Sequence, residues 1–254
     1  MCSFVLEAIR PSMKTPAFPK GMSNRSNPSD PMSRTTNASI GNDVMRAVGS
    51  LCERKLVLIP TETEYVLACN ALDVEALSAL RALQGEATSP LEVYVPSVEK
   101  FTNYVKEVPT ALARLAKRFL PGPMTFLLRR KHVISDWVTS GTDKVALRVP
   151  SHPLTLSLLN KLYFPLAVMS LPNSEKAGGV DADILDVLGE RVGYVLDGGA
   201  MAFGPGATWV EMGEDCILVH RVGSVSRESI EKVSGLPTFQ YLAPMTPARI
   251  ATSV

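Results

Sequence analysis

The sequence has few cysteines, few aromatic residues and no excess of either charge, and each shortage excludes a class of protein. Four cysteines in 254 residues, none in a C-x-x-C pair, indicate reduced thiols rather than a disulfide framework or a zinc site. The 26 basic residues are balanced by 25 acidic ones, which argues against a polybasic nucleic-acid binder but leaves room for a local basic groove. No run of about eighteen apolar residues occurs, so we expect no transmembrane helix and no membrane partner. These features are typical of a cytoplasmic protein.

The first 41 residues differ in composition from the rest. They contain five prolines, seven serines and five basic residues against two acidic ones. Such a segment buries too little apolar surface to offset the entropy of ordering it, so we expect a disordered leader. Its basic, acid-poor composition is also typical of an organellar transit peptide, although an unstructured extension is the simpler explanation. We expect one domain at residues 42–235 and a loose, proline-containing tail at 236–254.

Helical and strand-like hydrophobic patterns alternate through the expected domain. A period of 3.6 residues predicts helices at 44–51, 74–83, 110–119, 153–162, 182–190 and 226–233. Short apolar or alternating runs predict strands at 56–59, 91–95, 124–128, 145–149, 166–169, 192–196, 208–211 and 217–220. Because strands and helices interleave without strict βαβ order, the pattern favours an α/β or α+β layered domain with a mixed, twisted sheet.

One set of hydroxyl side chains follows a predicted strand, and another hydroxyl begins a second strand. Strand ends are where ligands usually bind in open α/β folds. The segment PTETEY places Thr61, Thr63 and Tyr65 directly after a strand, where they can donate to a carboxylate or phosphate. A plain polar turn would have the same composition. The rigid turn PGPMT places Thr125 at the start of another strand, where turn architecture alone can also explain it.

Arginines and glycines lie at further strand ends. Arg148 ends a run of apolar residues, so it makes either a buried ion pair or a bidentate contact with an anion. Glycines at 198–199 and 204–206 can present backbone N–H groups to a phosphate, although neither a P-loop nor G-x-G-x-x-G order is present. Arg221 follows the last of these strands. Together, the hydroxyls, arginines and glycine turns predict a pocket for a small anionic ligand such as a nucleotide.

Seven short motifs carry a resemblance to a known family. They are IPTETEY (59–65), PL (90–91), FLPGPMT (119–125), ALRVPSHP (146–153), PLAVMS (165–170), LDGG (196–199) and RVGSVS (221–226). In order and spacing they resemble the YrdC-like family, the threonylcarbamoyl-AMP synthases, from about Val44 to Val233. The resemblance implies a twisted sheet with flanking helices around a concave, positively charged cavity. It also implies a nucleotidyltransferase that forms threonylcarbamoyl-adenylate from threonine, bicarbonate and ATP for the modification of a tRNA adenosine.

The resemblance assigns roles to single residues but identifies no catalytic group. It implies a threonine pocket formed by Thr61, Thr63 and Tyr65. It implies nucleotide contacts or a nucleotide-facing wall from Thr125, Arg148, Ser170, Thr208 and Arg221. ATP would enter as a substrate together with Mg²⁺, with no metal held by the protein itself. The implied macromolecular partner is tRNA or double-stranded RNA.

The departures from the family pattern fall on motifs that face the ligand. The family's K-x-R-P before Pro-Leu is replaced by a shorter segment with Gln84 and Glu86, so both cations are missing. Its V-Y-G-L reads EYVL, which puts Val66 in place of a glycine, and its S-T-V reads ATW at 207–209. Its S-A-N reads SLP, with Asn173 displaced by one. These changes leave two alternatives open: a relative that binds nucleotide or RNA without turnover, and an enzyme that acts on another small acid or amine.

Overall fold

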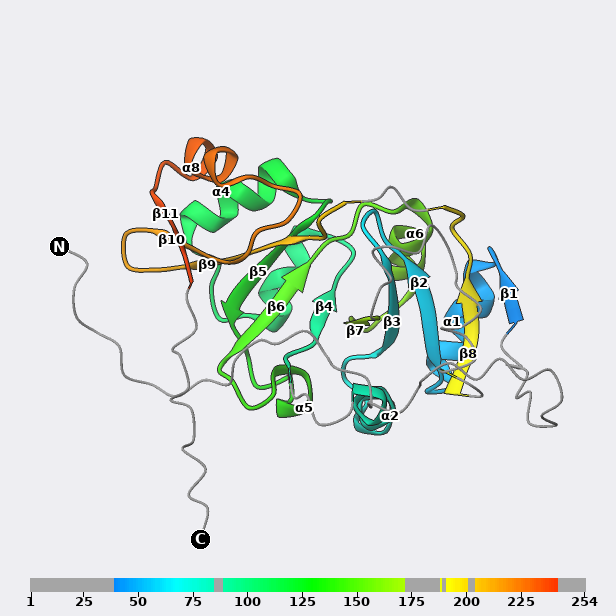
Figure 1. Cartoon of the computed structure of the whole chain (residues 1–254). Helices are drawn as coiled ribbons and strands as arrows, with labels where there is room; N and C mark the ends of the chain where they lie inside the picture. The colour runs from blue at the N-terminus through cyan, green and yellow to red at the C-terminus, as the bar shows by residue number, and fades with distance from the viewer. Residues whose placement is uncertain (1–38, 85–88, 172–187, 189–190, 201–203, 242–254) are drawn as a thin grey trace, which may run out of the picture.

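A computed structural model of the chain describes residues 39–84, 89–171, 188, 191–200 and 204–241 (Figure 1). These residues form one 11-stranded mixed sheet with the strand order β1-β8-β2-β3-β7-β4-β6-β5-β9-β10-β11. The strands are β1 (Ser39–Gly41), β2 (Leu56–Pro60), β3 (Tyr65–Asn70), β4 (Glu92–Tyr94), β5 (Met124–Arg129), β6 (Lys144–Arg148), β7 (Leu166–Ser170), β8 (Val192–Leu196), β9 (Thr208–Met212), β10 (Ile217–Arg221) and β11 (Thr238–Gln240).

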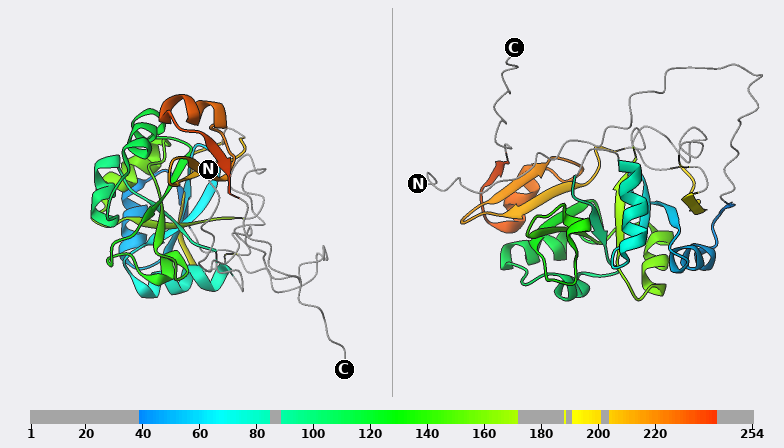
Figure 2. Two further views of the ribbon diagram at one scale, coloured as in Figure 1. Left: turned by 90° about the vertical axis from the view of Figure 1, so that its left-hand side faces the viewer. Right: turned by 90° about the horizontal axis from the view of Figure 1, so that it is seen from below.

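Helices pack against the sheet, and two pairs of them lie near its ends. The helices are α1 (Val44–Cys52), α2 (Val74–Gln84), α3 (Phe101–Tyr104), α4 (Thr110–Phe119), α5 (Asp136–Thr139), α6 (Pro153–Lys161) and α8 (Arg227–Ser234), with a 3-10 turn η1 (Val98–Lys100). Helices α1 and α6 pack together near β2 and β8, whereas α4 and α8 pack together near β9 and β11. Figure 2 shows these two helix pairs at opposite ends of the sheet. None of the helices within the described residues combines the length and the apolar character that crossing a bilayer requires.

Strand alternation divides the side chains of the central strands between two faces. Met124, Phe126 and Leu128 of β5 belong to the main core, together with Leu147 of β6 and Val210 of β9. Because successive side chains of a strand point to opposite faces, the residues between them lie on the other face. We call this the site face, and it carries Glu92, Tyr94, Thr125, Leu127, Ala146, Arg148, Trp209 and Glu211.

The site face has an apolar floor of its own. Leu127, Ala146, Ala207 and Trp209 form a small cluster that is separate from the main core. Farther along the same side of the sheet, α1 and α6 bury a second core against β2, β3, β7 and β8. The polar residues of the site face therefore lie between two apolar regions, where water competes less for their hydrogen bonds.

The structure agrees with the predicted fold class and adds elements that the patterns missed. Strand β3 was not predicted, since YVLACN is buried along its length and lacks alternation. Strands β1 and β11 lie within the segments that the sequence analysis assigned to the leader and the tail. They form because their backbone groups pair with β8 and β10. Residues 39–41 and 238–240 thus belong to the sheet. Apart from Leu188, the helix predicted at 182–190 lies outside the described residues.

Candidate functional site

The turn between β2 and β3 is shaped by the hydroxyl of Thr61. Thr61 Oγ1 accepts hydrogen bonds from the N–H groups of Thr63 (3.2 Å) and Glu64 (3.0 Å) and donates to the carbonyl of Glu64 (2.7 Å). The backbone N–H of Thr61 donates to the same carbonyl at 2.9 Å. Thr61 is fully buried, and its hydroxyl hydrogen is used within the turn. Thr63 lies beside it, with the two hydroxyl oxygens 3.1 Å apart.

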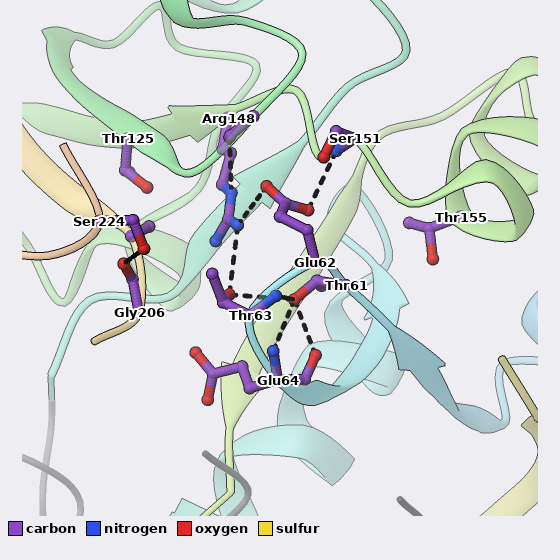
Figure 3. Close-up of polar contacts among 12 residues, drawn as sticks. Thr61, Glu62, Thr63, Glu64, Thr125, Arg148, Ser151, Thr155, Gly206 and Ser224 are labelled. Atoms are coloured by element: carbon purple, nitrogen blue, oxygen red, sulfur yellow. Dashed lines mark hydrogen bonds and ion pairs between the residues drawn. The ribbon is translucent and has the colours of Figure 1, made fainter. Parts of the chain in front are cut away.

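Arg148 reaches from the end of β6 to this turn (Figure 3). Its Nη2 donates to Glu62 Oε1 at 2.7 Å and to Thr63 Oγ1 at 3.3 Å. Its Nη1 donates to the Tyr94 hydroxyl at 3.3 Å, and its Nε donates to the carbonyl of Gly122 at 3.2 Å. The side chain is 0% exposed. Of the two roles that the sequence left open for Arg148, the structure therefore shows the buried ion pair.

The charge of Arg148 is stabilised by its surroundings. Burial alone would lower the pKa of this guanidinium, but Tyr94, Glu62 and Glu92 favour its charged form and raise the pKa above the ordinary value. Burial also raises the pKa of Tyr94, so its phenol stays protonated. Arg148 is thus charged at neutral pH, where it pairs with Glu62. It fixes the turn after β2 to the end of β6.

Glu62 joins a third segment to the site. Its Oε2 accepts a hydrogen bond from the N–H of Ser151 at 3.0 Å, while Oε1 binds Arg148. His152 follows Ser151, and burial lowers the pKa of its imidazole against the opposing effect of Glu62. The imidazole is therefore mostly neutral at neutral pH. Its Nδ1 is buried without a hydrogen-bond partner.

Tyr65 connects the start of β3 to the glycine turn after β8. Its hydroxyl accepts a hydrogen bond from the N–H of Gly198 at 3.0 Å. The same hydroxyl lies 3.0 Å from the carbonyl of Gly199 and 3.2 Å from Asp197 Oδ1, and its one hydrogen can donate to either. Burial raises the pKa of Tyr65, and the neighbouring Asp197 raises it further. Tyr65 therefore positions the LDGG turn next to the PTETEY turn.

A buried carboxylate that the sequence analysis missed lies beside Thr125. Thr125 Oγ1 donates to Glu92 Oε2 at 2.9 Å, and the same oxygen is 4.0 Å from Arg148 Nη1. Glu92 is 6% exposed. A signal was present in the sequence, because Glu92 is an acidic residue in an otherwise apolar strand. Such a residue is rarely buried without a functional or pairing partner.

Carboxylates gather at this end of the site face. Glu64 accepts a hydrogen bond from the Ser170 hydroxyl at 3.0 Å, which places Ser170 at the same turn. The pKa of Tyr94 responds to Glu92, Glu64 and Glu62 together, so all three lie near its ring. Glu62 and Glu92 thus lie at the guanidinium of Arg148, and Glu64 lies near Tyr94. Among the described residues at this turn, acidic side chains outnumber the one arginine, whereas the family resemblance implied a positively charged cavity.

Thr208 and Arg221 lie on the β9–β10 side of the site. The Thr208 hydroxyl donates to the carbonyl of Val225 at 2.9 Å and accepts from the N–H groups of Gly223 (2.9 Å) and Val225 (3.0 Å). Its hydrogen-bonding capacity is therefore used to shape the turn after β10, which does not support the predicted contact with a nucleotide. Arg221 Nε donates to the carbonyl of Ala207 at 2.9 Å. Figure 3 shows the nearby bond from Ser224 Oγ to the carbonyl of Gly206, 2.9 Å long.

The segment that departs from K-x-R-P is bordered by a different arginine. Arg81 donates to the carbonyls of Trp137 (2.8 Å), Val138 (3.1 Å) and Ser89 (2.6 Å), and also to the side chain of Gln84. Burial lowers the pKa of Arg81 to about 10, so it stays charged at neutral pH. It connects the two ends of the segment 85–88. Glu86 and the displaced Asn173 lie outside the described residues.

The predicted site residues thus do not all come together. Thr61, Thr63, Arg148 and Ser170 come together at the turn after β2, with Tyr65 at its far end and Thr125 linked through Glu92. Arg221 lies across the apolar floor, whereas Thr208, which pairs with Met124 in the sheet, points to the face of the main core. Among the residues that the structure describes, no group of three or more His, Cys, Asp or Glu side chains could hold a metal ion.

Comparison with known proteins identifies the fold. The model of the family of Sua5, YciO and YrdC proteins, described as "Telomere recombination", matches residues 50–223. The chain belongs to the Sua5/YciO/YrdC family. The solved structure of P. abyssi Sua5 complexed with L-threonine is similar to this Sua5/YrdC chain with a TM-score of 0.67 at 31% identity, covering 80% of this chain and 62% of the other. The predicted fold class and family resemblance are therefore confirmed.

Three curated relatives of this Sua5/YrdC chain are named threonylcarbamoyl-AMP synthase. This chain is 35% identical over 191 residues to the one from Pyrococcus abyssi, and the match covers 74% of this chain and 56% of that relative. It is 30% identical over 195 residues to the threonylcarbamoyl-AMP synthase of Mus musculus, covering 75% and 69%. The Bacillus subtilis relative of the same name is 31% identical over 195 residues, and 56% of its length is matched. The chain thus spans a little over half the length of the first relatives it matches.

Proposed function

We propose that this chain forms threonylcarbamoyl-adenylate from threonine, bicarbonate and ATP, as a donor for the modification of a tRNA adenosine. The names of the relatives support this reaction, and so does the L-threonine complex of the P. abyssi protein at 31% identity. The single observation that carries the proposal is the buried cluster of Thr63, Glu62 and Arg148 at the turn after β2. The cluster lies at a strand end, where small ligands bind in sheets of this kind.

Thr63 is the hydroxyl in this cluster that is suited to contact substrate. Arg148 Nη2 donates to its oxygen, and the hydrogen of Thr61 is already bound to the carbonyl of Glu64. The hydrogen of Thr63 can therefore turn from Thr61 toward a ligand oxygen such as the threonine carboxylate. Its donor strength is increased because the oxygen accepts a hydrogen bond from a charged group. Thr61 instead holds the shape of the turn.

The reaction needs acceptors for an amine and donors for developing negative charge. The amine of threonine attacks the carbon of bicarbonate, water leaves, and a carbamate forms. A carbamate oxygen then attacks the α-phosphorus of ATP, and pyrophosphate leaves as the bond to it breaks. The carboxylates of Glu62 and Glu64 offer acceptors near the first step. Arg221 offers a donor near the second, where fixed donors stabilise the charge of the transition state. Thr125, whose hydrogen is bound to Glu92, lines the wall beside the nucleotide.

The remaining participants follow from the same reaction. Mg²⁺ would arrive on the phosphates of ATP as part of the substrate. The balanced charge and the scattered cysteines support a cytoplasmic enzyme. A role of residues 1–41 in organellar targeting stays a prediction from composition. The acceptor of the product is a tRNA adenosine.

Titration calorimetry of the full chain with ATP and Mg²⁺, with and without threonine and bicarbonate, tests the proposal. A product assay on the same sample then looks for threonylcarbamoyl-adenylate and pyrophosphate. Micromolar binding with product that depends on all three substrates is the expected result. ATP binding without product would refute turnover and favour a relative that only binds nucleotide. The Thr63→Val variant is the matched control, and it should bind ATP but lose the threonine dependence.

A further inference from the structure

Trp209 occupies the middle of the site face. In the pairing of the sheet it lies opposite Thr125 of β5 on one side and opposite Arg221 of β10 on the other. Both neighbours are residues that the proposed function places beside the nucleotide. The resemblance places a valine at this position, where this chain has an indole ring with a hydrogen-bond donor. Only Trp209 and Trp137 carry such a ring in the sequence.

The indole of Trp209 is held in place but its donor is not used. The ring packs with Leu127, Ala146 and Ala207, and the residue is 8% exposed. The guanidinium of Arg221 lies 5.7 Å from the ring centroid. The Trp209 Nε1 atom is buried and has no hydrogen-bond partner in the structure. Because buried N–H groups are almost always paired, an unpaired one on the site face is a candidate ligand contact.

A second unused donor lies close by. Arg221 Nε is bound to the carbonyl of Ala207, but its Nη2 is also buried without a partner. The side chain packs against Gly206, where an added Cβ would lie 2.8 Å from Nη2. The guanidinium thus has a fixed position next to the indole. Two adjacent unpaired donors, one of them charged, match an anionic oxygen better than a neutral group.

We infer that Trp209 is a nucleotide-binding residue, whose indole N–H donates together with Arg221 Nη2 to phosphate oxygens of the bound nucleotide. The inference rests on the proposed use of ATP and adds a contact that the family motifs do not contain. The apolar floor around the ring excludes water, which strengthens a hydrogen bond to a charged oxygen. Trp209 therefore replaces part of the phosphate binding that is lost with the cations missing at Gln84 and Glu86.

Two variants of the full chain test this role. In Trp137→Phe, which changes an exposed side chain on α5, Trp209 is the only tryptophan, and its fluorescence should change when ATP is added. Trp209→Phe keeps an aromatic ring on the floor but removes the N–H. It should bind ATP and AMP about 5- to 20-fold more weakly than the wild type, while adenosine binding is unchanged.

The outcomes separate this inference from the proposed function. Wild-type ATP binding with equal affinity in Trp209→Phe, or with no response from Trp209 fluorescence, would overturn the role of the indole and leave the proposed function standing. An equal loss for adenosine would overturn the assignment to a phosphate, because adenosine has none. If neither the wild type nor Trp137→Phe bound ATP, both the inference and the proposed function would be wrong. The fluorescence experiment keeps Trp209 itself, so it does not depend on the folding of Trp209→Phe.

Discussion

The replacement of Arg148 by methionine is the most direct test of how the site is held together. Methionine has a similar length but no charge, so Glu62 loses its cation and Glu92 loses the nearest positive charge. Removing one partner of a buried ion pair costs about 3–5 kcal/mol, because the other charge is left uncompensated. We therefore expect Arg148→Met to lower the free energy of unfolding by about that amount.

The destabilisation should depend on pH, and its sign follows from the carboxylates. Without Arg148, Glu62 and Glu92 are left without a nearby cation, and burial disfavours the charged form of a carboxylate. Protonation of a carboxylate removes that penalty. The deficit relative to the wild type should thus be smaller in acid than at neutral pH.

Urea unfolding of both proteins at several pH values between 4 and 8 measures this difference. Arg54→Met is the matched control, since Arg54 pairs with Asp73 and Glu75 but its side chain is 58% exposed. The control should lose less than about 1 kcal/mol. A deficit of similar size in both variants, or one that does not change with pH, would refute the reasoning. Adding Glu62→Gln to Arg148→Met should recover part of the stability at pH 8.

Four further variants test the site and a separate basic cavity. Glu92→Gln keeps an oxygen that can accept from Thr125 but removes a negative charge, so calorimetry should show ATP binding about three- to tenfold tighter, and weaker binding would contradict the electrostatic argument. Thr63→Val should weaken threonine binding with little change in the unfolding midpoint, whereas Thr61→Val should chiefly lower that midpoint. The reverse pattern would show that Thr61 contacts threonine and Thr63 shapes the turn. Lys106→Glu with Arg129→Glu changes a basic cavity of about 170 Å³ at the end of β5. It should weaken tRNA binding and reduce its salt dependence, and an unchanged salt slope would place the RNA elsewhere.

The sequence was most informative where a local pattern determines the structure. The strand β5 alternates between apolar residues of the main core and Thr125 or Leu127 of the site face, and this alternation can be read directly. The rigid turn before it and the proline that ends β2 also mark their positions without any tertiary information. Strand β3 was missed because it is buried on both sides, and such a run shows no period.

The partners of buried polar groups could not be read from the sequence. Arg148 was compatible with an ion pair or an anion contact, and only the three-dimensional structure brings Glu62 to it. Thr208 matched a ligand motif, yet its hydroxyl is used by the turn after β10. Glu92 belongs to no motif, and its partners Thr125 and Arg148 come from other strands. These outcomes depend on contacts between segments far apart in the chain, which local patterns do not encode.

The long-range contacts of the site also determine at which stage of synthesis it can form. Glu62 and Arg148 are 86 residues apart, and Tyr65 binds the LDGG turn from 133 residues away. During synthesis, the PTETEY turn emerges well before the strands that complete it, so a nascent chain ending after β3 carries the motif without a binding site. For the same reason, neither of two fragments separated between β3 and β6 contains the complete site. The site therefore forms only after β2, β3, β6 and β8 have all taken their places in the sheet.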